Sequence, residues 1–290
     1  MKIEKISING KISVPETALI PAADHGLMYG VNAFESLRVH QNGAFLLDEH
    51  FDRLARSLEG LGVDWDDDRK KYYSWIKELC AGMPQDKDAF IRFVVTAGSN
   101  DFWVAEERYA EPEVIIYRGS IPFYSPVNKR AITLKTVNRV KPEYFARTGF
   151  RIKSMDYISS RTAKLELKQA GESLEGILLT PDGFVAEGLT SNIFWVKSGQ
   201  LFTPALDSGI LAGTVRAYIM SDNEVKEKMA KVEELEDADE IFFTSGSGYL
   251  NPLSEINGKP KPGADGAKFQ ELYRKLLQDI DTKSQPLIQA

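Results

Sequence analysis

The sequence predicts an α/β fold of the α+β kind, divided into two domains, and three observations carry this prediction. Apolar and polar residues alternate on both sides of Asn9-Gly10, which is typical of an antiparallel hairpin. Apolar residues then recur at helical spacing from Phe51 to Leu61. Residues 119–126 contain prolines and serines without periodicity. We therefore expect a linker there, between a small α+β domain (1–118) and a larger domain (127–290).

The first domain is expected to combine antiparallel strands with two helices. Asp48 is a suitable N-terminal cap for the helix that carries Phe51, and a second helix should end near Gly82. The segment 24–30 has the composition of a loop or turn. The strand patterns of this domain cover residues 3–14, 34–39, 90–96 and 113–117.

The second domain should alternate strands with helices. One helix is expected after Gly213 and another near 268–277. The charged run 224–240 is most simply a solvated helix with a loop. The strand patterns of this domain cover residues 131–137, 192–196, 200–203 and 240–244, and a short apolar run lies at 176–180.

Composition excludes several functional classes. With 290 residues, 43% of them hydrophobic, the chain is long enough to bury a core, and its net charge of −6 argues against nucleic-acid binding. No signal peptide or membrane-length apolar run is present, so we expect a cytoplasmic protein that does not bind membranes. The single cysteine, Cys80, excludes an intrachain disulfide, and the three histidines have no metal-ligand spacing, so no metal site is predicted.

Two charged residues lie in unusual surroundings. Lys153 follows Ile152 in a stretch that should enter the interior, and Glu187 lies between Ala186 and Gly188, just after a turn at 181–183. Most lysines and glutamates are solvated surface residues, so neither residue alone establishes a site.

Several motifs together resemble one family. These are Asp24-His-Gly-Leu-Met-Tyr-Gly30, Arg151-Ile-Lys-Ser154 and Val185-Ala-Glu-Gly-Leu-Thr-Ser-Asn192, in this order along nearly the whole chain. The chain resembles the class IV aminotransferases, or fold type IV enzymes, which depend on pyridoxal 5'-phosphate. Branched-chain aminotransferases, D-amino acid aminotransferases and aminodeoxychorismate lyase belong to this family. The resemblance implies a two-domain fold and a homodimer.

The resemblance also assigns the cofactor residues. Lys153 would form the Schiff base and move a proton at the substrate Cα, and Glu187 would face the pyridine nitrogen. A helix N-terminus and a small-residue turn bind anions through backbone N–H groups, which suits the cofactor phosphate. Arg53 would add a countercharge, although a lone helical arginine usually lies at the surface. The remaining expected cofactor-binding residues are Tyr157, Gly213, Thr214, Val215, Gly246 and Ser247.

The substrate pocket departs from both main subfamilies. The Arg-Pro pair of branched-chain enzymes is replaced by Arg92-Phe93, and the Arg-x-His trap of D-specific enzymes by Phe102 and Val104. Arg38 and Arg92 are the nearby cations that could bind a substrate carboxylate; both could equally be outward-facing strand residues. Tyr29 would reach toward the partner subunit. The other expected substrate-binding residues are Phe34, Ser36 and Gly248.

The resemblance implies a ping-pong transfer of an amino group between an amino acid and a 2-oxo acid. We expect D-amino acids, such as D-alanine and D-glutamate, because the Arg-Pro pair is absent, because Tyr249 would crowd the phosphate side of the pocket and because Arg38 offers a cation on the other side. A branched-chain L-amino acid aminotransferase is the first alternative. A 4-amino-4-deoxychorismate lyase is the second, since Ser36 retains a hydroxyl where that relative has threonine.

Overall fold

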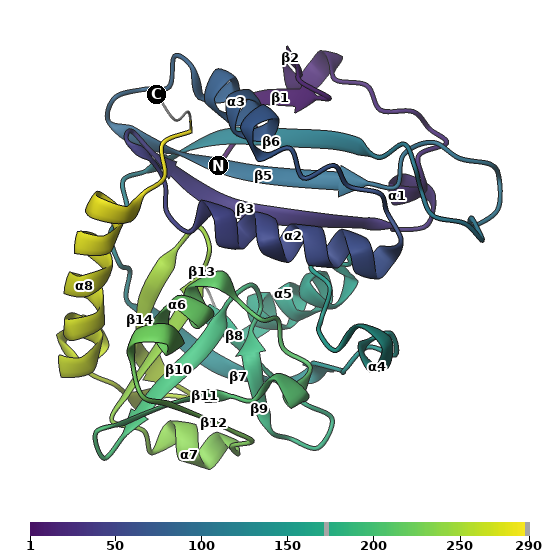
Figure 1. Ribbon diagram of the computed structural model, residues 1–290. Coiled ribbons are helices and arrows are strands. Elements are labelled where there is room, and N and C mark those ends of the chain that lie inside the picture. Colours follow the sequence, from purple (N-terminus) through teal and green to yellow (C-terminus); the bar gives the residue numbers. More distant parts are fainter. Residues whose placement is uncertain (171–173, 288–290) are drawn as a thin grey trace. The chain divides into compact units, whose positions relative to one another are not determined.

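The computed structural model describes residues 1–170 and 174–287 and divides into two compact units. The first unit comprises Met1–Tyr124, Ile152–Asp156 and the described residues from Asp279 onward. The second comprises Ser125–Arg151 and Tyr157–Gln278. Figure 1 labels their elements. The mixed helix-and-sheet architecture confirms the predicted fold class.

The first unit contains one antiparallel sheet in the order β2-β1-β6-β5-β3-β4. Its elements are β1 (Lys5–Ile8), β2 (Lys11–Ser13), η1 (Pro15–Thr17), α1 (His25–Met28), β3 (Asn32–His40), β4 (Gly43–Ala44), α2 (Leu47–Leu61), α3 (Arg69–Cys80), β5 (Lys87–Thr96) and β6 (Glu113–Pro122).

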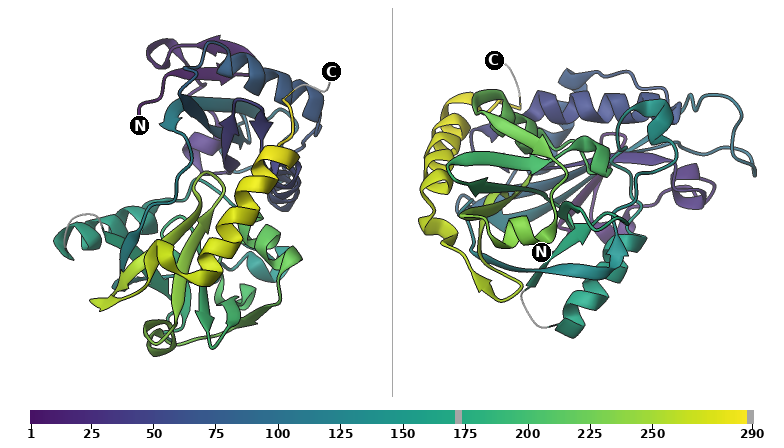
Figure 2. Two further views of the ribbon diagram at one scale, coloured as in Figure 1. Left: turned by 90° about the vertical axis from the view of Figure 1, so that its left-hand side faces the viewer. Right: turned by 90° about the horizontal axis from the view of Figure 1, so that it is seen from below.

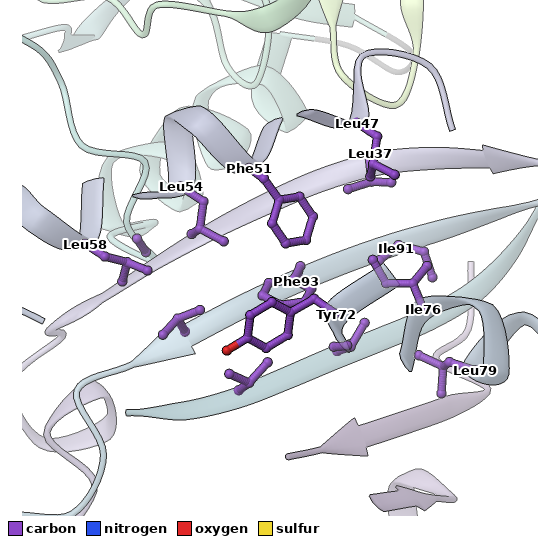
Figure 3. Close-up of a cluster of buried hydrophobic side chains, with 14 of the residues drawn as sticks. Leu37, Leu47, Phe51, Leu54, Leu58, Tyr72, Ile76, Leu79, Ile91 and Phe93 are labelled. Atoms are coloured by element: carbon purple, nitrogen blue, oxygen red, sulfur yellow. The ribbon is translucent and has the colours of Figure 1, made fainter. Parts of the chain in front are cut away.

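Helices α2 and α3 cover one face of this sheet, as Figure 3 shows. Phe51, Leu54 and Leu58 recur at helical spacing on α2 and point toward Phe93 of β5. Tyr72 of α3 meets the ring of Phe93 edge-on, with 5.4 Å between ring centroids. The apolar stripe read from the sequence thus forms the core that holds β3 and β5 in place.

The predicted hairpin is confirmed by the pairing of β1 with β2. Asn9 and Gly10 both have positive φ angles, 47° and 85°, which a tight hairpin of this kind requires. A Cβ at Gly10 would lie 2.7 Å from the indole of Trp75 on α3, so this turn also packs closely.

The second unit contains a mixed sheet in the order β12-β11-β10-β13-β14-β7-β8-β9, with β15 paired to β14. Its elements are β7 (Lys129–Asn138), α4 (Phe145–Thr148), α5 (Ile158–Ala170), β8 (Leu174–Leu179), β9 (Val185–Gly188), β10 (Asn192–Lys197), β11 (Gln200–Pro204), η2 (Leu206–Ser208), α6 (Thr214–Asp222), β12 (Val225–Lys228), α7 (Val232–Glu236), β13 (Glu240–Ser245), β14 (Tyr249–Ile256), β15 (Lys259–Pro260), η3 (Gly263–Asp265) and α8 (Ala267–Lys283).

Helix α5 packs beside β7 and β8 through Ala163 and Leu167 (Figures 1 and 2). Strand β7 runs parallel to both of its neighbours, β8 and β14. Strands β10, β13 and β14 are antiparallel, so their ends and the turn after β13 lie close in space.

The boundary between the units differs from the expected one. Strand β6 pairs with β5 as far as Pro122, inside the segment expected to be a linker, and the first unit extends to Tyr124. The last residues of α8, from Asp279, also group with the first unit. The segment Ile152–Asp156, with Lys153, groups with the first unit instead of the C-terminal domain. The reason is local, because the backbone carbonyl of Lys153 accepts a hydrogen bond of 2.9 Å from Phe34 N–H of β3.

Three local expectations were wrong. The loop at 24–30 contains the short helix α1. Helix α2 begins at Leu47, and Asp48, in its first turn, bonds Arg69 and Tyr73 instead of capping the helix. The charged run 224–240 includes β12, which pairs in parallel with β11. Strand β12 lies at the edge of the sheet, where charged side chains discourage pairing with other chains. Because these charges replace apolar residues, the alternation typical of a strand is not visible in the sequence.

Among the described residues, no helix combines the length and apolar character needed to cross a bilayer.

Candidate active site

The segment that carries Lys153 is fixed on the edge of β3 in the first unit. Besides the bond from Phe34 N–H to the Lys153 carbonyl, Met155 N–H donates to Asn32 Oδ1 at 2.8 Å. Asn32 is buried, so this anchor is shielded from water. The Lys153 Nζ lies 4.4 Å from the centroid of the Phe34 ring. The lysine side chain is therefore held over the sheet face opposite to the one that α2 and α3 cover.

The same face carries a second cation. Arg92 on β5 pairs directly with Ser36 on β3, and its guanidinium carbon lies 5.0 Å from the centroid of Phe34. The Ser36 Oγ is buried and has no hydrogen-bond partner among the described residues. A buried hydroxyl without a partner costs free energy, so its retention points to a polar ligand. Lys153 and Arg92, which share one aromatic ring, together make this face attractive to an anion.

Arg38, the other candidate for the substrate carboxylate, makes two hydrogen bonds within the first unit. Its Nη1 donates to Asp88 Oδ2 at 2.6 Å and to the Pro122 carbonyl at 2.7 Å. Burial alone would raise the pKa of Asp88, but His40 and Arg38 hold this pKa below its usual value. Asp88 is therefore ionised and pairs with Arg38, and Arg38 fastens the end of β6.

Arg53 belongs to a buried network on the opposite, helix-covered face. Its Nε and Nη2 donate to both carboxylate oxygens of Glu35, each at 2.7 Å, and His50 Nδ1 lies 2.7 Å from Glu35 Oε2. Burial alone would raise the pKa of Glu35, but Arg53 and His50 hold it far below its usual range. The bidentate contact fixes the plane of the guanidinium. Arg53 is thus an oriented, buried cation instead of a surface residue.

Tyr29 lies at the exposed end of the first unit. Its hydroxyl donates to the carbonyl of Phe102, and its ring meets that of His25 edge-on at 4.8 Å between centroids. These contacts attach α1 to the loop between β5 and β6 (Figure 1). Phe102 and Trp103 in this loop are 70% and 76% exposed.

In the second unit, Glu187 is buried on β9 with a cation beside it. Arg139 Nε, just after β7, lies 2.8 Å from Glu187 Oε1, an ion pair whose angle does not meet hydrogen-bond geometry. Glu187 Oε2 accepts from Leu211 N–H at 3.1 Å and from Asn192 Nδ2 at 3.3 Å. The carboxylate is therefore held in one orientation by three separate segments of the chain.

Gly213 begins helix α6 directly against Asn192. It is the N-terminal cap residue, and no side chain caps the helix. The first turn of a helix directs backbone N–H groups and the positive end of the helix dipole outward, which suits an anion. A Cβ at Gly213 would lie 2.0 Å from Asn192 Oδ1. Glycine is thus required here for close approach, and the same contact connects the helix N-terminus with the Glu187 environment.

Gly213→Ala should lower the free energy of unfolding by about 1–3 kcal/mol, because Asn192 must move away from the added methyl group. In an Asn192→Ala background the same substitution should cost little, since the clash is gone. Thermal unfolding of the four proteins of this cycle measures the coupling. An equal cost of Gly213→Ala in both backgrounds would show that Asn192 is not the obstacle.

The turn after β13 contains Gly246, Ser247 and Gly248. Ser245 Oγ accepts a hydrogen bond from Gly248 N–H at 3.2 Å, and Asn251 Nδ2 donates to the Gly248 carbonyl at 2.8 Å. Tyr249 follows with a positive φ of 43° and is buried. A tyrosine rarely adopts this backbone conformation, and such strain persists where the surrounding structure imposes it.

The other expected residue, Tyr157, lies just before α5 and is 36% exposed. Its carbonyl accepts a hydrogen bond of 2.8 Å from Arg161 N–H.

Sequence reasoning missed Arg139, Glu35 and His50. A signal existed for Glu35, because it alternates with Ala33 and Leu37 on the apolar face of its strand. Arg139 lies two residues beyond the strand predicted at 131–137. The sequence does not indicate which residue Glu35 or Arg139 contacts.

Known proteins of one family are similar to this chain over most of its length. A family model described as amino-transferase class IV matches residues 32–256. The chain is 31% identical over 285 residues to an aminodeoxychorismate lyase from Bacillus subtilis (strain 168), with 95% of each chain covered. It is 26% identical to a D-alanine aminotransferase from Bacillus licheniformis, covering 95% of this chain and 97% of the relative. The structure of a branched-chain aminotransferase from Thermoproteus uzoniensis with norvaline matches with a TM-score of 0.82 and 27% identity, covering 99% and 100% of the two chains.

Proposed function

The chain belongs to the class IV aminotransferases, and from this premise we propose that it moves amino groups from D-amino acids, such as D-alanine or D-glutamate, to 2-oxo acids. Enzymes of this family depend on pyridoxal 5'-phosphate, which supplies an electron sink for the substrate Cα when it is bound. The observation that supports the proposal most is the pair of cations, Lys153 and Arg92, beside one aromatic ring.

We assign the cofactor roles as follows. Lys153 carries the cofactor and moves the proton at the substrate Cα, and Glu187 faces the ring nitrogen. The residues present fit this group, since Glu187 is a buried carboxylate and Gly213 leaves the N-terminus of α6 without a capping side chain. We propose that backbone groups of that helix and of the turn after β13 bind the phosphate, and the resemblance adds Arg53 to this set. The full set for phosphate and ring is Arg53, Tyr157, Glu187, Gly213, Thr214, Val215, Gly246 and Ser247.

Arg92 takes over the carboxylate role first expected of Arg38. The direct pairing of Arg92 with Ser36 offers a guanidinium and a hydroxyl to one carboxylate, and the Phe34 ring places the Lys153 amine on the same face. The turn 245–248 offers only hydroxyls and backbone groups. A guanidinium paired with a hydroxyl supports D-substrates, because D-specific enzymes of this family bind the carboxylate with cationic or hydroxyl groups. The proposed pocket also contains Phe34, Ser36 and Gly248.

Arg92→Met should raise the KM for the amino acid about tenfold or more, because a charge-assisted contact to the carboxylate is lost. Arg38→Met should leave this KM within about twofold but lower the melting temperature, because Asp88 would remain buried without its guanidinium. Steady-state kinetics and thermal unfolding of both variants measure the difference. The opposite pattern, with KM raised by Arg38→Met alone, would return the carboxylate role to Arg38.

A donor screen tests the substrate class. D-alanine, D-glutamate, L-leucine and L-valine are each offered with a 2-oxo acid acceptor, and we expect faster transfer from the D-amino acids. Faster transfer from L-leucine would reject the D-specific proposal in favour of a branched-chain L-amino acid aminotransferase.

A second candidate is 4-amino-4-deoxychorismate lyase activity. The buried Ser36 hydroxyl without a partner favours it, as does the 31% identity to the Bacillus subtilis lyase. Incubation with aminodeoxychorismate in the absence of a 2-oxo acid distinguishes the two reactions. Release of pyruvate under these conditions would establish the lyase reaction, and its absence together with active transamination would exclude it.

We also propose that the enzyme is a homodimer that pairs through the exposed apolar end of the first unit. Four large apolar side chains are mostly exposed there: Leu27, Phe102, Trp103 and Val104. Such a patch is unusual on a surface that contacts only water. Trp103→Glu should convert the dimer to monomers, whereas Trp103→Phe should not. Sedimentation of the three proteins measures the mass. A monomeric wild type, or a dimeric Trp103→Glu variant, would exclude this surface.

A further inference from the structure

The environment of Glu187 contains a residue with no assigned role. Arg139 Nε lies 2.8 Å from Glu187 Oε1, and the Arg139 side chain is only 13% exposed. Its backbone N–H donates to the Leu179 carbonyl of β8 at 2.7 Å, which fixes the residue where β7 ends. Arg139 is therefore held in place by the sheet and directed at the carboxylate.

Two neutral groups also donate hydrogen bonds to Glu187. Leu211 N–H and Asn192 Nδ2 donate to Oε2, and Thr244 pairs directly with Asn192 on the neighbouring strand. Neutral donors compensate only part of the cost of burying an ionised carboxylate, and burial without a cation favours the protonated acid. The guanidinium of Arg139, 2.8 Å from Oε1, offsets part of this cost and favours the ionised form of the carboxylate.

The basicity of the Glu187 carboxylate decides whether a proton lies on the carboxylate or on the ring nitrogen that it faces. A carboxylate and a ring nitrogen compete for one proton, and a cation beside the carboxylate makes the carboxylate the weaker base. Without Arg139, the buried carboxyl group would become the stronger base and would take the proton from the nitrogen. Only the protonated ring is a strong electron sink.

We infer that Arg139 is a positioning residue that keeps Glu187 ionised and thereby holds the proton on the cofactor's ring nitrogen. This inference rests on the proposed function, in which Glu187 faces that nitrogen. Arg139 touches neither substrate nor cofactor in this account and acts through Glu187.

The test is the nitrogen-15 NMR signal of bound pyridoxal 5'-phosphate labelled at the ring nitrogen. In the wild-type holoenzyme the signal should lie at the position of a protonated pyridine. Arg139→Gln and Arg139→Met should move it more than half of the way toward neutral pyridine, and Arg139→Lys, which keeps the charge, should leave it near the wild-type position. The dissociation constant of the cofactor should rise about tenfold in Arg139→Gln, because the charged contact between the Glu187 carboxylate and the protonated ring nitrogen is lost. Two uncharged variants are measured because one of them could fail to fold.

Glu187→Gln separates the inference from the proposed function. If Glu187→Gln moves the signal but Arg139→Gln and Arg139→Met do not, the inference about Arg139 is overturned and the placement of Glu187 stands. If Glu187→Gln leaves the signal unchanged, Glu187 does not face the nitrogen and the proposed assignment fails. If Arg139→Lys moves the signal as far as Arg139→Gln does, charge is not the cause and the inference fails.

Discussion

Lys153→Ala should abolish amino transfer and remove the absorbance band of the lysine-bound cofactor. The reason is chemical, because a side-chain methyl group can neither carry the cofactor nor move a proton at the substrate Cα. The fold should persist, since the segment is held on β3 by the Lys153 carbonyl and by Met155 N–H, neither of which needs the amine. Turnover should fall by several orders of magnitude. Single-turnover kinetics and absorbance spectra measure both effects.

Lys164→Ala is the matched control for this variant. Lys164 is exposed on α5, so its truncation should leave rate and spectrum at wild-type values. Near-wild-type turnover of pure Lys153→Ala would exclude Lys153 as the catalytic lysine. An equal loss of turnover and absorbance in Lys164→Ala would show that the effect is not specific to Lys153.

Glu35→Gln should lower the free energy of unfolding by about 3–5 kcal/mol, because it leaves the guanidinium of Arg53 buried without its countercharge. The side chains of Glu35 and Arg53 are 1% and 7% exposed, so water cannot replace the lost contact. The variant should also bind pyridoxal 5'-phosphate more weakly, since the bidentate contact that orients Arg53 is lost. Denaturant titration and cofactor titration measure the two effects.

The stability difference should depend on pH in one direction. Burial would raise the pKa of Glu35, but Arg53 and His50 bring it below its ordinary value of 4.5. A carboxylate with a lowered pKa stabilises the fold fully above its ordinary value, and this contribution is lost as the pH falls toward the folded-state pKa. The difference in the free energy of unfolding between wild type and Glu35→Gln should thus stay constant above about pH 5.5 and shrink at lower pH. Glu106→Gln, on an exposed loop, is the control and should match wild type throughout.

The sequence was sufficient for features that depend on local spacing. The helical stripe on α2 and the hairpin at Asn9-Gly10 follow from periodicity and turn chemistry, and the structure contains both. Lys153 and Glu187 were recognised from short motifs, and the structure places each in an ordered environment.

Partners distant in sequence could not be derived in this way. Arg38 was a candidate for the pocket as a cation near Ser36 and Phe34, and its hydrogen bond to Asp88, 50 residues later, has no signal in the sequence. Arg139 and Glu187 meet because β7 and β9 lie on either side of β8, a sheet order that the sequence does not specify. Lys153 groups with the first unit because its backbone docks on β3, a contact that no local pattern signals.

The central claim is that Lys153 carries the cofactor, and borohydride reduction of the holoenzyme followed by peptide mapping tests it most directly. Reduction fixes the cofactor permanently to the amine that holds it. We predict that a single peptide containing Ile152-Lys153-Ser154 gains the mass of the reduced cofactor and that Lys153→Ala gains none. Label on another lysine, or no label on a protein that is catalytically active, would contradict the account.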